Sequence, residues 1–204
     1  SQGAFLRDSI MTGISYMIPV IVGAGVIQAI AKAMGGYDIG NHMDQIDTIA
    51  KAIMLLGQNM MNYVVPVIAA FIAYAMADKP GLAPGFVMGA LAGAINTGFV
   101  GGVVGGIMVG YFVLMLKKIK VPKAIQGIMP ILVYPVVTTL VCGLLMYYVV
   151  GRPISWFMAW LTSGLMALSG GSRFVLGAVI GAMICLDHGG PINKTAALFV
   201  NGLN

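Results

Sequence analysis

Residues 81–110 read GLAPGFVMGALAGAINTGFVGGVVGGIMVG and hold ten of the 29 glycines in the chain. Glycine recurs at every fourth position in two sets, at 81, 85, 89 and 93 and then at 98, 102, 106 and 110. Each set forms a stripe on one helix face, where a neighbouring backbone can approach closely. Because Asn96-Thr97 separates the sets, we expect a hairpin of two half-length helices, with a single tilted helix as the alternative.

The charges on either side of this stretch favour the hairpin. Asp78-Lys79 precedes it, and four lysines follow it at positions 117, 118, 120 and 123. Such a basic cluster is typical of a cytoplasmic loop under the positive-inside rule. If both flanks are cytoplasmic, the chain between them must enter the membrane and return to the cytoplasmic side. A single helix would instead place Asp78-Lys79 outside.

The composition identifies an integral membrane protein whose main partner is the lipid bilayer. The chain is 59% hydrophobic and 8% charged, with a mean hydropathy of +0.96, whereas soluble domains are about a quarter charged. The net charge of +5 does not predict binding to nucleic acid, because the basic surplus gathers in the juxtamembrane lysines. Cys142 and Cys185 lie in apolar runs, so we expect buried thiols and no cofactor or metal site.

We therefore expect an all-α, polytopic transmembrane protein with re-entrant hairpins. Further spans are predicted at about 9–33, 52–77 and 127–150, with an outside loop at 35–51 and an interfacial helix at 154–168. A polar patch in the second of these spans (Gln58, Asn59 and Asn62) would either face an aqueous path or bond a neighbouring helix.

Residues 187–194, DHGGPINK, follow the uncharged run 174–186. Those 13 residues extend only about 20 Å as a helix, short of the roughly 30 Å hydrocarbon core. The polar octet should therefore lie within the membrane, where irregular backbone must be buried in protein or line a wet cavity. Ionisable residues at that depth indicate a functional site.

The octet suits the recognition of a neutral, hydroxylated solute. Asp187 can accept two hydroxyl hydrogens, Asn193 can donate and accept, and His188 can do either. Gly189-Gly190 and the following proline make a tight reversal that exposes backbone polar groups. An Asp187–Lys194 ion pair that only stabilises the turn is the alternative. The second histidine, His42, lies far away in the predicted outside loop, so a metal role for His188 is disfavoured.

Four stretches together resemble the fructose-type enzyme IIC components of the bacterial sugar phosphotransferase system. They occur in the family's order along nearly the whole chain: IMTGISYMIP at 10–19, YAMADKPGLAPG at 74–85, GFVGG at 98–102 and DHGGPINK at 187–194. The second and fourth are the most specific.

The resemblance implies a homodimeric permease of the glucose superfamily in the bacterial inner membrane. Such a subunit binds a hexose-type sugar, with fructose as the first choice, and a phosphocysteine on the partner IIB domain, supplied through IIA, phosphorylates it. The resemblance also implies that residues 1–150 form the dimerisation or scaffold part. Residues 151–204 would then be an interfacial helix and the first re-entrant hairpin of the transport part, with the octet at the hairpin tip. The substrate-binding residues would be Asp187, His188, Gly189, Gly190, Asn193 and Lys194.

No catalytic residue is expected in this chain, because the phosphoryl donor belongs to IIB, and whether the chain counts as an enzyme stays open. A later Gly-Ile-Thr-Glu-type motif of the family should lie beyond Asn204, so we expect a longer parent polypeptide, cut here at its carboxyl end. Two other functions remain open: an ion-coupled secondary carrier of a small polar solute, and a non-transporting assembly module. Dependence on phosphoenolpyruvate rather than on an ion gradient would separate the first two.

Overall fold

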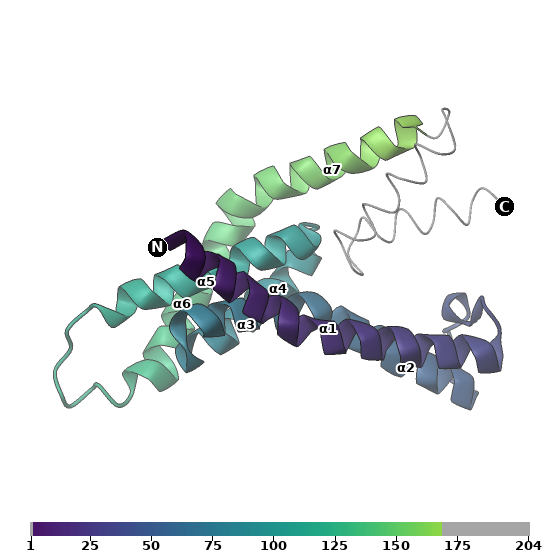
Figure 1. Cartoon of the computed structure of the whole chain (residues 1–204), viewed down its shortest axis with the longest axis horizontal. Coiled ribbons are helices and arrows are strands. Elements are labelled where there is room, and N and C mark those ends of the chain that lie inside the picture. The colour runs from purple at the N-terminus through teal and green to yellow at the C-terminus, as the bar shows by residue number, and fades with distance from the viewer. Residues whose placement is uncertain (1, 169–204) are drawn as a thin grey trace.

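The structure is a computed structural model that describes residues 2–168. Within that range it is helical and contains no strand, which confirms the expected all-α architecture. The helices are α1 (Gln2–Gly35), η1 (Ile39–Asn41), α2 (Ile49–Asn62), α3 (Val64–Ala77), α4 (Lys79–Ala94), α5 (Gly98–Lys117), η2 (Met129–Val133), α6 (Tyr134–Leu145), η3 (Met146–Val150) and α7 (Gly151–Leu168) (Figure 1). Four helical runs in the described part are long and apolar enough to cross a membrane: Gln2–Gly35, Ile49–Ala77, Gly98–Lys117 and Met129–Gly164.

The predicted second span is divided in two. Helices α2 and α3 meet at Tyr63, whose N–H bonds the carbonyl oxygens of Met60 and Met61. Pro66 stands in the first turn of α3, where its missing N–H has no helical partner to lose. The predicted span over about 52–77 is confirmed as Ile49–Ala77, with a break at Tyr63 that the sequence did not predict.

Helix α1 runs antiparallel to α2 and α3. Its last residue, Gly35, packs against Ala50 at the start of α2, while Gly13 packs against Ile68 and Ile72 of α3. The ring of Tyr16 stacks on Phe71 with a centroid distance of 3.9 Å. The helix is longer than the predicted 9–33 and continues through Pro19. The amino terminus therefore lies at the same end of the molecule as the end of α3.

Helix α3 is the centre of the core, and both glycine stripes pack onto it. A Cβ placed on Gly85 would lie 2.9 Å from the carbonyl oxygen of Ala69, and one on Gly106 would lie 2.6 Å from the same atom. Gly81 and Gly89 meet other backbone atoms of α3 in the same way, whereas Gly102 and Gly110 pack mainly against the side chains of Val65 and Met76. Ala69 is fully buried as a result. The predicted close approach of backbones is confirmed for Gly81, Gly85, Gly89 and Gly106.

The predicted hairpin is also confirmed, since α4 and α5 are separate helices that pack against each other. The turn between them contains Asn96 at φ 57° and leads into Gly98 at φ 58°, both left-handed conformations. One detail differs from the prediction. Helix α5 has 20 residues and is about 30 Å long, so it is a full span rather than a half-length arm.

The last span begins at Met129 and contains two π-helical segments, η2 and η3, on either side of α6. Pro130 lies within η2, where its missing N–H removes one bond of the regular ladder. Helix α7 begins at Gly151, earlier than the predicted 154, and extends away from the α3-centred core (Figure 1). A Cβ on Gly151 would collide with the carbonyl oxygen of Met146, so glycine permits this junction.

Candidate functional site

The six residues predicted to bind sugar lie outside the described range 2–168. They are Asp187, His188, Gly189, Gly190, Asn193 and Lys194. Their roles stay predictions. What the structure describes is the scaffold that precedes them and the helix, α7, that leads toward them in sequence.

One end of this scaffold is basic, and a single hydrogen bond organises it. The ammonium group of Lys117, at the end of α5, donates to the carbonyl oxygen of Ala77, at the end of α3, over 2.7 Å. The turn at Asp78-Lys79 and the lysine loop 117–123 therefore lie at the same end. This agrees with the hairpin topology that the charges predicted.

Asp78 carries backbone strain that sequence reasoning did not find. Its φ of 62° and ψ of −160° fall in a region that is almost exclusive to glycine. The side chain makes no capping bond to α4. Three residues later, a Cβ on Gly81 would lie 2.7 Å from the carbonyl oxygen of Ala73, so the chain reverses in a very confined space. The motif at 74–85 is thus a tight, strained turn at the basic end.

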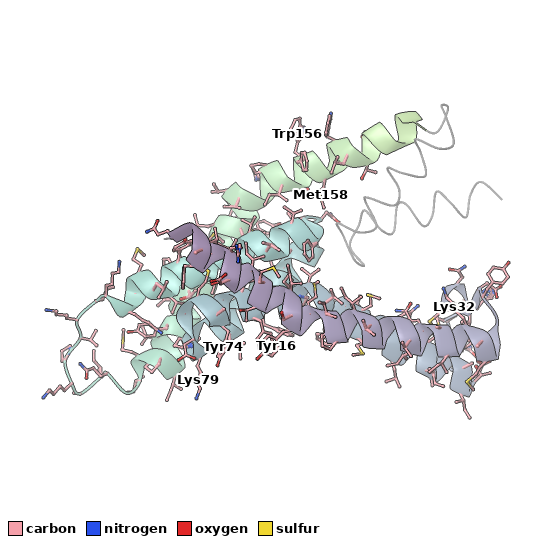
Figure 2. All side chains as sticks on the ribbon, viewed as in Figure 1. Tyr16, Lys32, Tyr74, Lys79, Trp156 and Met158 are labelled. Atoms are coloured by element: carbon pink, nitrogen blue, oxygen red, sulfur yellow. The ribbon has the colours of Figure 1, made fainter. Side chains whose placement is uncertain are left out.

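The opposite end is acidic. The loop between α1 and α2 carries Asp38, Asp44 and Asp47. Asp47 pairs with Lys51 over 2.8 Å, and this bond lowers the pKa of the exposed Asp47 carboxyl. Figure 2 shows Lys79 at the basic end and Lys32 far from it, near this loop. The positive-inside rule predicts that the basic end faces the cytoplasm and the acidic loop lies outside, and this sidedness stays a prediction.

A polar cavity of about 660 Å³ lies at the acidic end, between the α1–α2 loop and the helices that carry it. Gln28 in its wall donates a 3.2 Å hydrogen bond to the carbonyl oxygen of Gly57. Of the predicted polar patch, Gln58 lines this cavity, whereas Asn59 bonds the carbonyl oxygen of Leu55 in its own helix. Asn62 is exposed. The three residues therefore do not act as one group.

The described residues hold no cluster of three histidine, cysteine or acidic side chains. Cys142 is fully buried in the α6 wall of the core. A soluble partner domain cannot reach this thiol in the folded scaffold.

Four long apolar helical runs, a basic face and glycine-mediated packing around α3 define a polytopic α-helical membrane protein. The chain matches the family model described as "Phosphotransferase system, EIIC" over residues 11–204, and it belongs to this family. The resemblance predicted from the four motifs is confirmed.

Several curated relatives carry fructose in their names. The "PTS system fructose-specific EIIB'BC component" of Xanthomonas campestris is 48% identical over 196 residues, which are 95% of this chain and 34% of the relative. The protein of the same name in Escherichia coli is 43% identical over 205 residues, covering 100% of this chain and 35% of the relative. The Bacillus subtilis "PTS system fructose-specific EIIABC component" is 38% identical over 193 residues, or 93% of this chain and 30% of the relative.

The chain thus spans about a third of the length of these relatives. No match to a solved structure was found.

Proposed function

We propose that this chain is the sugar-translocating membrane part of a phosphotransferase permease, with fructose as its first candidate substrate. The observation that carries the proposal is the EIIC family match over 11–204. It is supported by fructose-specific relatives that align with nearly the whole chain. A mannosylglycerate-specific relative at 42% identity keeps a second sugar class open.

The phosphoryl donor in this proposal is a IIB domain fed by IIA. The names of the relatives, EIIB'BC and EIIABC, support such domains as partners, either fused or separate. The burial of Cys142 supports a donor outside the scaffold, because phosphoryl transfer needs an accessible thiolate. The chain would bind the sugar, expose it to the cytoplasm and leave its phosphorylation to IIB.

The sugar site in this proposal is the octet at 187–194. Sugar hydroxyls each donate and accept, and leaving a buried polar group unpaired costs about 1–3 kcal/mol. Asp187 and Asn193 would satisfy hydroxyls from opposite sides of the Gly189-Gly190 reversal, with His188 and Lys194 beside them. A site of this composition in the membrane suits a neutral polar solute.

The scaffold and transport parts would divide near residue 150, within a homodimer in the bacterial inner membrane. The division is supported by the junction at Gly151, where α7 leaves the core (Figure 1). A candidate dimer surface is the row of exposed apolar side chains along α1, which includes Ile18, Val22 and Val26.

The test uses membranes that contain the complete permease together with its IIA and IIB domains. Phosphoenolpyruvate-dependent phosphorylation should be measured with fructose, mannitol, mannosylglycerate and glucose. The proposal expects one phosphorylated product, with fructose preferred. Uptake of unmodified sugar that depends on an ion gradient and not on phosphoenolpyruvate would overturn it.

A further inference from the structure

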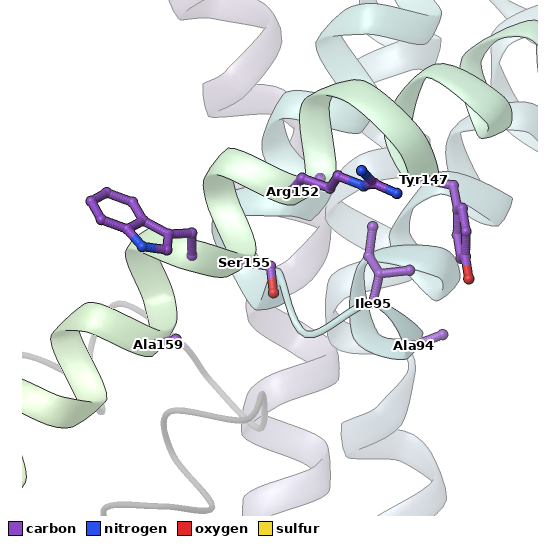
Figure 3. Close-up of a pocket in the computed structure, with 8 residues that line it drawn as sticks. Ala94, Ile95, Tyr147, Arg152, Ser155 and Ala159 are labelled. Atoms are coloured by element: carbon purple, nitrogen blue, oxygen red, sulfur yellow. The ribbon is translucent and has the colours of Figure 1, made fainter.

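A second cavity, of about 510 Å³, lies at the corner where α7 leaves the core (Figure 3). Its walls come from three places: the end of α4 with the α4–α5 turn, the π-helical segment η3, and the first turns of α7. The lining residues are Ala94, Ile95, Tyr147, Gly151, Arg152, Ser155, Trp156 and Ala159. None of them belongs to the proposed sugar site.

The predicted topology puts the cavity at the non-cytoplasmic boundary of the hydrocarbon layer. Helix α5 separates the α4–α5 turn from the cytoplasmic lysines by about 30 Å, which is one hydrocarbon thickness. The continuous helical run from Met129 to Val150 covers a similar distance before it reaches Gly151. A Cβ on Gly151 would lie 2.6 Å from Cδ1 of Ile95, so both helical ends meet at this depth.

Arg152 brings to this place a positive charge that no described residue balances. Its side chain is exposed in the cavity wall, and it makes no ion pair within residues 2–168. The acidic residues within the described range are at 8, 38, 44, 47 and 78, and none of these five lines the cavity. A guanidinium at the edge of the hydrocarbon layer gains most from an anion that it can bind through several N–H groups. Lipid phosphate is the abundant anion at that depth.

The other polar and aromatic groups fit a lipid better than a free sugar. Trp156 is 72% exposed and Tyr147 is 53% exposed, and such amphipathic rings favour the headgroup level of a bilayer. Ser155 adds a hydroxyl donor beside Arg152. Further along α7, the rings of Phe157 and Trp160 stack at 6.0 Å and are also exposed. A neutral sugar would leave the charge of Arg152 uncompensated, whereas a phospholipid compensates it and covers the rings.

We propose that this cavity is a binding site for the phosphate headgroup of an anionic phospholipid of the outer leaflet, held by Arg152 and Ser155 and flanked by Tyr147 and Trp156. A net anionic lipid such as phosphatidylglycerol is preferred, because it carries no ammonium to oppose Arg152. The bound lipid would tie the start of α7 to the α4–α5 turn. This proposal stands on the cavity and its charge, and it is independent of which solute the permease carries.

The test is lipid titration of the purified complete permease by native mass spectrometry, with phosphatidylglycerol and phosphatidylcholine of equal chain length. Wild-type protein should prefer phosphatidylglycerol. Arg152→Gln should weaken its binding about tenfold, whereas Arg152→Lys should retain most of it. Lys32→Gln is the matched control, because it removes a positive charge at the outer end but outside this cavity, and it should bind like the wild type.

Three results would overturn the proposal. The first is equal affinity of the wild type for the two lipids, which does not depend on any variant folding. The second is displacement of phosphatidylglycerol by millimolar inorganic phosphate, which would identify a free-anion site. The third is wild-type affinity of Arg152→Gln for phosphatidylglycerol, which would mean that the guanidinium group does not hold the lipid.

Discussion

Lys117 and Ala77 are 40 positions apart in sequence, yet the Lys117 ammonium donates a 2.7 Å hydrogen bond to the Ala77 carbonyl oxygen. Ala77 ends α3, and the carbonyls of a last helical turn lack partners in their own helix. A cation there both satisfies such a carbonyl and opposes the negative end of the helix dipole. This bond closes the α3–α4–α5 unit and aligns two loops on one face.

The topology follows from that alignment and can be tested by cysteine labelling. Asp78→Cys and Lys120→Cys should both react with a membrane-impermeant maleimide only in inverted membrane vesicles. Asp44→Cys, in the acidic loop, should react in intact spheroplasts. Labelling of the Asp78 and Lys120 positions from opposite sides would contradict the hairpin. The parent protein controls for its own cysteines.

The glycine stripe provides a matched pair one helical turn apart. A Cβ on Gly89 would lie 2.6 Å from the carbonyl oxygen of Val65, whereas one on Gly93 would have no described heavy atom within 4 Å. Gly89→Ala should therefore separate α4 from α3 and destabilise by about 1–3 kcal/mol. Gly93→Ala should be neutral or stabilising by up to about 1 kcal/mol, because alanine favours helix. Thermal unfolding of the detergent-solubilised permease measures both, and equal Tm values for the two variants would refute this packing.

The glycine spacing predicted two helix faces of close approach from sequence, because helical periodicity depends only on local geometry. The spacing does not, however, predict which helix the two stripes contact. That partner is α3, and its identity depends on tertiary packing around residues such as Ala69. The break at Tyr63 and the strain at Asp78 were missed for a related reason, since surrounding contacts can impose backbone angles that the residues themselves do not favour.

Replacing either of two buried threonines by valine should have opposite effects on stability. Both Thr97 and Thr138 are 0% exposed. The Thr97 hydroxyl donates to the carbonyl oxygen of Ala92 over 3.0 Å, whereas the Thr138 hydroxyl has no partner among the described residues. Thr97→Val should destabilise by about 1 kcal/mol, and Thr138→Val should be neutral or stabilising by a similar amount. The comparison is made by Tm. A destabilised Thr138→Val would show that its hydroxyl is bonded in the complete permease.

Asp78→Gly should relieve the strain at the basic turn. A non-glycine residue held in this region destabilises the fold by about 1–3 kcal/mol. Glycine removes this strain, but it also raises the conformational entropy of the unfolded chain, which offsets part of the gain. We expect a net stabilisation of about 1 kcal/mol and a higher Tm. Asp78→Ala keeps a Cβ in the strained conformation and should show no gain. If the alanine variant gains as much as the glycine variant, backbone strain is not the cause.

For the candidate sugar site, the sequence predicts which residue types are present but not how their side chains are arranged in space. A polar octet after a run too short to span indicates a re-entrant segment, and the resemblance of its sequence to the family predicts that this octet binds the sugar. The side-chain geometry of Asp187 and Asn193 depends on the segments that surround them and not on the octet alone. Substitution is therefore the direct way to assign their roles.

Asp187→Ala in the complete permease should lower kcat/KM for sugar phosphorylation by about 100-fold or more, without loss of membrane insertion. The reason is that a carboxylate can accept two sugar hydroxyls, and a hydrogen bond to a charged group contributes about 1.5–3 kcal/mol. The measurement is phosphoenolpyruvate-dependent phosphorylation by membranes with matched amounts of protein. Asp44→Ala, in the acidic outer loop, is the control and should retain full activity.

Lys194→Ala distinguishes two possible roles of Lys194, an ion pair with Asp187 and a direct contact with the sugar. If Lys194 only neutralises Asp187 across the turn, the variant should lose Tm and folded yield while its KM for sugar stays near the wild-type value. A normally folded variant with a specifically raised KM would instead place the ammonium group on the sugar. If Asp187→Ala phosphorylates sugar at the wild-type rate, the Asp187 carboxylate is not part of the sugar site, regardless of the result for Lys194→Ala.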